Sequence, residues 1–334
     1  MQWYYGFDFG ADTLRMADTG GDLKQEAAWA AFRGSENTPF AWGDRAYTFL
    51  GREANGVRLR QCMQGGVPLD PELMRRWVLH MLGSGDRSLL RRRRALIALS
   101  PLVPDSVREY MLTTVLGDSM DMVGAVPMDM AAGLGAGADI MGENGCFLMD
   151  IGASHMTFSV IAGGRRVRVR SLPYGMDQAD EQIIDRVRLE RGLVITRRVA
   201  RLLKHSAFSD SANTNPLPVF DPLTRLPCYE QLDANIAQDS LNEIVAGILD
   251  LCKGAMSGLS PELSEDAARF GIVLTGGGSL LGGLDVCLKN ELQLPVTAAQ
   301  SPREAVWRGL DLILKQPELY SPLIIDWREG SLRL

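Results

Sequence analysis

One local pattern occurs twice in this sequence and constrains the fold more than any other feature. Residues 3–16 and 147–161 each read as a strand, a tight turn of small and polar residues, and a second strand. In both copies an aspartate near the end of the first strand precedes a glycine by two positions, at Asp8 and Gly10 and at Asp150 and Gly152. Glycine lets the backbone bend closely at such a turn. The repeated hairpin predicts two related lobes.

Strand and helix patterns alternate between and after the two hairpins. We expect helices at 71–82, 105–116, 178–191, 196–205 and 240–256, strands at 95–100 and 272–275, and an exposed hairpin or loop within 209–227. Such alternation favours an α/β architecture. The length of 334 residues agrees with two domains of roughly 150 residues each.

Composition and charge exclude several classes of protein. The formal net charge of -6 argues against a general nucleic-acid binder, which needs a basic face. Five scattered cysteines and three histidines argue against a disulfide or zinc framework. The N-terminus lacks a signal-peptide pattern, and no stretch approaches the roughly 20 apolar residues of a membrane span. We therefore expect a cytoplasmic protein.

The aspartates and glycine turns together indicate a site for phosphate and metal. Backbone N–H groups of glycine-rich turns bind anions, and nearby carboxylates hold Mg²⁺. A third turn, Gly276 to Gly278, follows the expected strand at 272–275 directly, and Ser279 is expected to open a helix. An Asp-x-Gly alone is more often an ordinary turn than a ligand site, and a triple glycine after a strand is a tight turn about as often as a nucleotide loop. Their combination in strand contexts is more specific.

Three segments carry a resemblance to MreB proteins, a family of bacterial actins. Gly6-Phe7-Asp8-Phe9-Gly10 and Met149-Asp150-Ile151-Gly152 look like the family's first and second phosphate motifs. The run from Arg269 to Leu281, Arg-Phe-Gly-Ile-Val-Leu-Thr-Gly-Gly-Gly-Ser-Leu-Leu, looks like its adenosine motif. Residues 221–227, 260–263 and 301–306 are also similar, so the likeness covers about residues 5 to 315. Collinearity on this scale separates MreB from sugar kinases and chaperone ATPase domains.

The resemblance implies an actin-like α/β fold, with two lobes around a nucleotide cleft. Lobe I is expected at residues 1–145 and lobe II at 146–334, with the last helix of the core returning to lobe I. The implied cofactors are ATP and Mg²⁺, with Asp8 and Asp150 facing the metal. The implied nucleotide contacts are Gly10, Ala11, Asp12 and Thr13 in the first turn, Gly152, Ala153, Ser154 and His155 in the second, and Gly276, Gly277, Gly278 and Ser279 at the adenosine.

Two segments of the implied nucleotide site depart from the family pattern. The family's Glu-Arg-x-Lys helix maps onto residues 201–204, so that Lys204 fits a nucleoside contact while Arg201 replaces the acidic partner. The second phosphate turn reads Gly-Ala-Ser-His where the family has Gly-Gly-Gly-Thr, and added side chains limit the approach of backbone to phosphate. His155 is either a phosphate neighbour in place of Thr or a side chain that partly blocks the pocket.

The largest departure concerns hydrolysis. Where the family carries Glu-Glu-Pro-Met, this chain has Pro127-Met128-Asp129-Met130. The second Glu is the residue expected to polarise the attacking water, and Met128 stands in its place. A thioether does not accept a water proton, and losing such a group forfeits about 10² to 10⁴ in rate. On an extended segment Asp129 would point to the opposite face. The site is predicted to bind ATP and to hydrolyse it poorly.

A basic and apolar run at residues 86–94 is the candidate membrane contact. It places Leu89 and Leu90 beside Arg91 and Arg92, where MreB proteins carry a hydrophobic loop that dips into the bilayer. Arginines near an anionic leaflet contribute around 1 kcal/mol each. The alternative is a solvated basic loop.

The resemblance implies a filament subunit that organises cell-wall synthesis to maintain cell shape. Its expected partners are further copies of itself, the inner face of the cell membrane, a standard MreB and cell-wall synthesis proteins. Two alternatives remain open: a regulatory pseudo-actin that acts on a standard MreB filament, and an active actin-fold ATPase or sugar kinase. Residues 316–334 extend beyond the resemblance.

Overall fold

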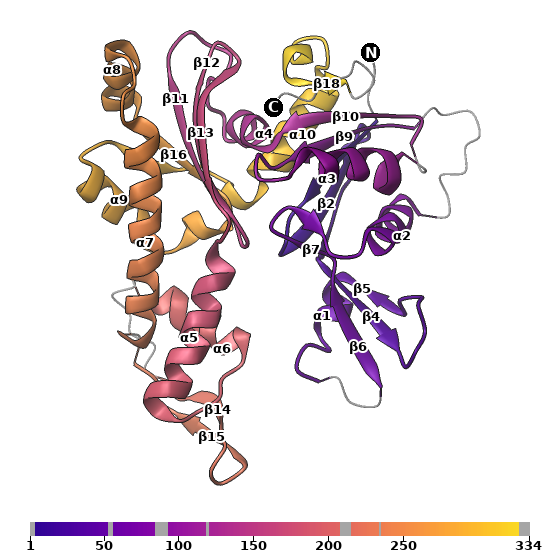
Figure 1. The fold of residues 1–334 in the computed structure, drawn as a ribbon, viewed down its shortest axis with the longest axis vertical. Helices are drawn as coiled ribbons and strands as arrows, with labels where there is room; N and C mark the ends of the chain where they lie inside the picture. The colour runs from indigo at the N-terminus through magenta and orange to yellow at the C-terminus, as the bar shows by residue number, and fades with distance from the viewer. Residues whose placement is uncertain are drawn as a thin grey trace. The chain divides into compact units, whose positions relative to one another are not determined.

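The computed structural model describes residues 4–52, 56–83, 93–117, 120–207, 215–233 and 235–326 (Figure 1). The chain divides into two compact units. Unit 1 comprises Met1–Glu143, Ile161–Arg166 and Arg303–Leu334, and unit 2 comprises Asn144–Val160 and Val167–Pro302. The lobe boundary expected after residue 145 stays a prediction; the compact units first divide after Glu143.

Unit 1 is built on a six-stranded sheet with the order β18-β10-β9-β1-β2-β3. Strand β1 pairs in parallel with β9 and antiparallel with β2, and β9 pairs in parallel with β10. The C-terminal extension supplies the edge strand β18, antiparallel to β10. The strands are β1 Tyr5–Phe9, β2 Thr13–Asp18, β3 Leu23–Ala27, β9 Arg94–Leu99, β10 Met122–Pro127 and β18 Ile325–Asp326.

Helix α2, Pro71–Leu82, covers this sheet and agrees with the predicted bounds. The Asp70 carboxylate accepts a hydrogen bond from the Leu73 N–H at 3.1 Å, and Pro71 occupies the first helical position. Both features favour a helix start. Trp77 is fully buried and lies edge-on to Phe9 of the sheet.

The other helices described in unit 1 include α1 Gly43–Tyr47, α3 Asp105–Tyr110, the π-helix Met111–Leu116, α4 Met128–Gly135, α10 Ala305–Lys315 and the 3₁₀-helix Ser321–Leu323. Helices α4 and α10 cross with their backbones in contact. A Cβ atom at Gly135 would lie 1.9 Å from the Ala305 carbonyl oxygen, and one at Gly309 would lie 1.9 Å from that of Ala131. Only glycine allows this approach.

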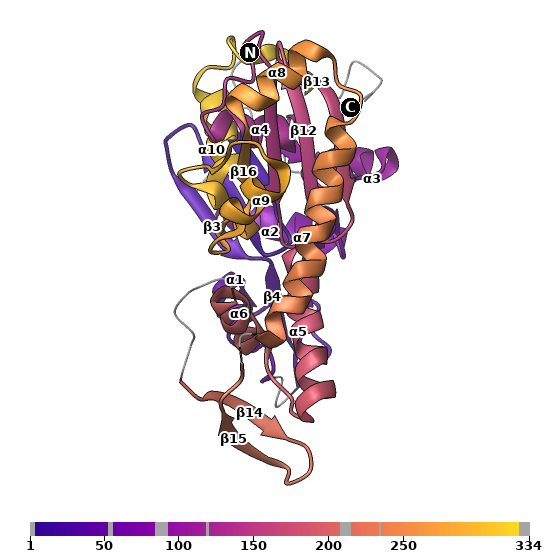
Figure 2. The ribbon, with the colours of Figure 1, turned by 90° about the vertical axis from the view of Figure 1, so that its left-hand side faces the viewer.

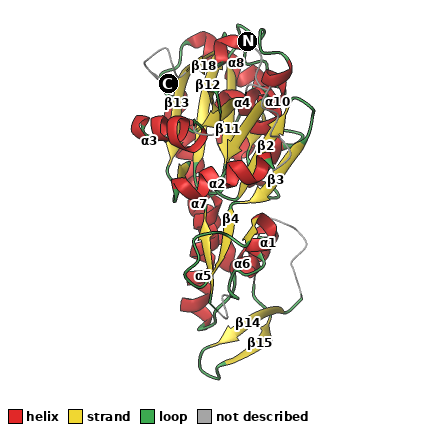
Figure 3. Ribbon diagram, turned by 90° about the vertical axis from the view of Figure 1, so that its right-hand side faces the viewer, coloured by secondary structure: helices red, strands yellow, loops and turns green. Residues whose placement is uncertain are grey.

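Unit 1 also contains small sheets that the sequence patterns did not indicate, one of which includes the strand β4 labelled in Figure 3. One has the order β5-β4-β6, and β7 pairs with β8. Their bounds are β4 Trp29–Arg33, β5 Ala41–Trp42, β6 Val57–Gln61, β7 Met63–Gln64 and β8 Val67–Pro68.

Unit 2 has a five-stranded sheet with the order β13-β12-β11-β16-β17. Helix α7, Asn235–Met256, runs beside it (Figure 2) and buries Leu241, Ile244 and Ile248 against the sheet core. The strands of this sheet are β11 Cys146–Ile151, β12 Met156–Ala162, β13 Arg165–Leu172, β16 Ile272–Thr275 and β17 Val296–Ala298. Helices α8 Pro261–Phe270 and α9 Leu284–Leu292 also belong to unit 2.

A second core in unit 2 lies between α5, Met176–Arg191, and α6, Arg197–Ser206. Ile183, Val187 and Leu203 are buried there. A hairpin is present but lies further along the chain than the expected range 209–227: its strands are β14 Leu217–Asp221 and β15 Leu226–Glu230.

Three expectations about helices differ from the structure. Helix α7 begins at Asn235, five residues before the expected start at 240. The helix at 105–116 is α-helical only to Tyr110 and continues as a π-helix, whose wider turn sequence patterns do not distinguish. Ser279 does not open an α-helix: it lies in the 3₁₀-helix Gly277–Leu280, and the next α-helix begins at Leu284.

Candidate functional site

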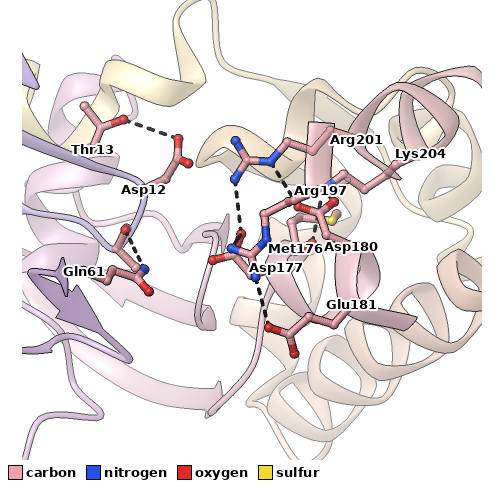
Figure 4. A network of polar contacts seen from close by, with 11 residues as sticks. Asp12, Thr13, Gln61, Met176, Asp177, Asp180, Glu181, Arg197, Arg201 and Lys204 are labelled. Carbon is pink, nitrogen blue, oxygen red and sulfur yellow. Dashed lines mark hydrogen bonds and ion pairs between the residues drawn. The ribbon is translucent and has the colours of Figure 1, made fainter. Parts of the chain in front are cut away.

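The first predicted turn, residues 10–13, joins β1 to β2 in unit 1. A Cβ atom at Gly10 would lie 2.7 Å from the Thr13 carbonyl oxygen, so the turn closes tightly only with glycine at its start. The Gln61 side-chain amide donates to the Ala11 carbonyl at 3.1 Å, a contact drawn in Figure 4. The Thr13 hydroxyl donates to Asp12 at 3.4 Å. Ala11 is buried.

Asp8, expected to face a metal ion, is paired with an arginine. Asp8 and Arg15 lie directly opposite each other on β1 and β2. The Arg15 guanidinium is 3.1 Å from the Asp8 carboxylate, and the two side chains are only 12% and 6% exposed. A fixed cation therefore already balances the charge of Asp8, and this carboxylate fits the role of a Mg²⁺ ligand poorly.

The second predicted turn, residues 152–155, repeats this geometry in unit 2. A Cβ atom at Gly152 would lie 2.8 Å from the His155 carbonyl oxygen, which accepts a hydrogen bond from the Gly152 N–H at 3.0 Å. The His155 side chain is buried. The two turns, separated by 142 positions between Gly10 and Gly152, close in the same way.

Asp150 and the glycine-rich turn lie at one edge of the unit 2 sheet. Strands β11 and β16 are parallel, with Asp150 opposite Thr275, so both lead to turns at the same edge. The Thr275 hydroxyl donates to the Asp150 carboxylate at 2.9 Å. Gly276 has φ 79°, and a Cβ atom there would lie 2.3 Å from the Ile151 carbonyl oxygen. Residues 276–279 and 152–155 are thereby brought together.

The role of Asp150 as a Mg²⁺ ligand stays a prediction. The neutral Thr275 hydroxyl donates to its carboxylate and helps to orient it. Mg²⁺ is held through one or two carboxylates together with water and substrate phosphates. Among the described residues, no group of three or more Asp, Glu, His or Cys side chains could hold a metal ion. A Mg²⁺ site of this kind does not require such a group.

Lys204 and Arg201 are engaged within unit 2 (Figure 4). The Lys204 ammonium pairs with Asp180 and donates to the Met176 carbonyl at 3.1 Å. The Arg201 guanidinium is 3.0 Å from Asp180 and 3.4 Å from Asp177. Asp180 is fully buried, and the Lys204 side chain is 8% exposed. The role of either residue as a nucleoside contact stays a prediction.

Met128 and Asp129 lie at the start of a helix, which differs from the extended segment expected from the sequence. Residues 128 and 129 do not lie on an extended segment: helix α4 begins at Met128, so the expectation that Asp129 points to the opposite face of a strand is wrong. Asp129 is buried, 3.8 Å from the Arg166 guanidinium. Met128 is 7% exposed. The Asp129 carboxylate therefore has a structural partner.

The membrane prediction falls on residues that the structure does not describe. Leu89, Leu90, Arg91 and Arg92 lie between the described ranges 56–83 and 93–117. Within the described ranges, no helix combines the length and the apolar character that crossing a bilayer requires.

Sequence reasoning missed Arg15 and the neighbours of the second turn. Arg15 was foreseeable, because a tight turn at residues 10–12 places residues 8 and 15 opposite each other. Gly175 was not, because its role depends on tertiary contact: a Cβ atom there would lie 2.5 Å from the Gly152 carbonyl oxygen.

Comparison with known proteins identifies the family to which this chain is similar. The family model described as MreB/Mbl protein matches residues 3–321. The chain is 28% identical to the cell shape-determining protein MreB of Escherichia coli strain K12 over 309 residues, 90% of this chain and 89% of the relative. It is 26% identical to the cell shape-determining protein Mbl of Bacillus subtilis strain 168 over 315 residues, covering 92% and 95%.

Solved structures show the same fold. MreB5 of Spiroplasma citri bound to ADP has a TM-score of 0.88 at 22% identity, covering 96% of this chain and 97% of that one. The MamK double helical filament has a TM-score of 0.80 at 16% identity, covering 94% and 98%. The predicted actin-like α/β fold is confirmed. The family match over nearly the whole length shows that this chain belongs to the MreB/Mbl family of bacterial actins.

Proposed function

We propose that this chain binds ATP with Mg²⁺, hydrolyses it slowly, and assembles with itself into filaments that help to determine cell shape. The observation that carries nucleotide binding is the pair of turns at Gly10 and Gly152, which close in the same way in the two units. The relative MreB5 of Spiroplasma citri was solved with ADP and with AMPPNP, which supports nucleotide binding by this chain.

Each described group has a proposed role. The backbone of residues 10–13 and 152–155 binds phosphate, and residues 276–279 bind the nucleoside. The Asp150 carboxylate, oriented by Thr275, faces the phosphates, where a bound Mg²⁺ supplies neutralising charge. Met128 cannot take a proton from water, so turnover is slow.

Self-association is proposed from the relatives, among which MamK was solved as a double helical filament. Filaments of this chain are proposed to lie in the cytoplasm on the inner face of the cell membrane, held by Leu89, Leu90, Arg91 and Arg92, and to organise cell-wall synthesis proteins. The test is pelleting and electron microscopy of the purified protein with and without ATP, alone and with liposomes. Filaments that require ATP support the proposal, and a monomer under all conditions contradicts it.

A second candidate function is regulation of a standard MreB filament. The observation that favours it is the ion pair between Arg15 and Asp8. This pair neutralises one of the two carboxylates that were expected to face the metal. A regulator would pellet only in the presence of a standard MreB, whereas a filament subunit would pellet alone. The same assay therefore separates the two functions.

A further inference from the structure

Helix α5 is attached at its first turn to the second phosphate turn. The Met176 N–H donates to the Gly152 carbonyl at 3.1 Å, and the Asp177 N–H donates to the Ala153 carbonyl at 2.8 Å. The first N–H groups of a helix have no partners within the helix, and two of them here bind the turn. The position of Gly152 and Ala153 is therefore set by the N-terminus of α5.

Helix α6 in turn holds that N-terminus. Lys204 donates to the Met176 carbonyl and pairs with Asp180, and Arg201 reaches both Asp180 and Asp177. Figure 4 shows the basic side chains of α6 directed at the first turns of α5. A continuous set of bonds thus runs from α6 through residues 176–180 to the turn at Gly152.

The charges within this network balance one another. Three cations of α6, Arg197, Arg201 and Lys204, face three carboxylates of α5, Asp177, Asp180 and Glu181. A buried charge is stable only while it is paired, and removing its partner is strongly destabilising. Removing Arg201 would leave the fully buried Asp180 carboxylate with one cation fewer.

We propose that Arg201 is a positioning residue for the phosphate turn at 152–155, acting through α5, and that it does not contact the nucleoside. This inference rests on the proposed function, because it assigns Arg201 to the phosphate half of the same nucleotide site. Where the family has a Glu that is expected to contact the nucleoside, this chain then has Arg201, which forms ion pairs with Asp177 and Asp180.

The test compares two ligands that share phosphates but differ in the nucleoside. ATP and inorganic tripolyphosphate, each with Mg²⁺, are titrated calorimetrically into the wild type and Arg201→Ala. A positioning residue affects both ligands, so we expect both dissociation constants to rise by the same factor, on the order of tenfold for a lost charge-assisted contact. A rise for ATP alone would show a direct nucleoside contact and overturn the inference, as would no rise for either ligand.

Arg186→Ala is the matched control. Arg186 is 29% exposed against 31% for Arg201, and it pairs with Asp239 and Glu243, away from the first turn of α5. We expect both dissociation constants to stay at the wild-type values in this variant. Arg201→Lys, which keeps the charge, should recover part of the affinity lost in Arg201→Ala.

A second measurement needs no ligand. Amide hydrogen exchange at Met176 and Asp177 reports the bonds that join α5 to the turn, and it should be faster in Arg201→Ala than in Arg186→Ala. Equal exchange in the two variants would overturn the inference. If the wild type bound neither ligand, the proposed function would fail, while the exchange result would still decide whether α6 holds α5.

Discussion

Arg15 lies directly opposite Asp8 on neighbouring strands, with its guanidinium 3.1 Å from the carboxylate. Asp8 is one of two carboxylates that the resemblance to MreB assigns to the metal. The other, Asp150, accepts from the neutral Thr275 hydroxyl. The two hairpins share their backbone geometry, but the Asp8 carboxylate is already paired with a guanidinium. We therefore expect the dependence on Mg²⁺ to rest on Asp150.

The Arg15–Asp8 pair should contribute strongly to stability. Arg15→Met removes the guanidinium that pairs with the buried Asp8 carboxylate, and breaking a buried pair costs about 3 to 5 kcal/mol. Urea denaturation measures this loss. Asp8→Asn in the same background should recover part of it. The control is Lys315→Met, which removes an exposed pair with Asp311 worth about 0.5 kcal/mol or less. Equal losses in Arg15→Met and Lys315→Met would show that the pair is unimportant.

Alanine should be tolerated differently at three glycines. Gly10→Ala and Gly152→Ala place a Cβ atom 2.7 and 2.8 Å from a carbonyl oxygen of the same turn, so the turn must open, at about 1 to 3 kcal/mol. Both should weaken ATP binding in a calorimetric titration. Gly282→Ala meets no atom within 4 Å and should bind like the wild type. If the ATP affinity is unchanged in all three variants, the two turns are not part of the ATP-binding site.

Met128→Glu should increase ATP hydrolysis. The carboxylate would restore a group that accepts a proton from water, an effect typically worth about 10² to 10⁴ in rate. Steady-state phosphate release at saturating ATP measures it, and Met128→Leu, which stays apolar, should remain at the wild-type rate. A wild type as fast as a standard MreB measured beside it would refute the assignment of Met128.

Apolar and basic residues of the proposed membrane loop should respond differently to salt. Leu89→Ser with Leu90→Ser should reduce liposome co-sedimentation at every salt concentration, because burial of apolar groups is little screened. Replacing Arg91 and Arg92 with Ser should weaken binding mainly at low salt, where the Debye length is about 10 Å or more. If both variants bind anionic vesicles like the wild type, these four residues do not attach the protein to the membrane.

Local signals predicted those elements whose ends are encoded by neighbouring residues. Helix α2 begins at Pro71 because Asp70 caps it, and both residues are visible in the sequence. The start of α4 at Met128 was missed because its preceding residue, Pro127, makes no side-chain cap. The partners of Lys204 were also missed, since Asp180 lies 24 positions away and only the packing of α5 on α6 brings them together.

The most direct test of the account is thermal unfolding of the wild type and Asp150→Ala with ATP, in the presence and absence of Mg²⁺. A ligand that binds only the folded state stabilises it by about 2.7 kcal/mol at 100 times its dissociation constant. We predict that ATP with Mg²⁺ raises the unfolding temperature of the wild type, and that Asp150→Ala loses the part that depends on Mg²⁺. An unfolding temperature of the wild type that does not change with millimolar ATP and Mg²⁺ would contradict nucleotide binding.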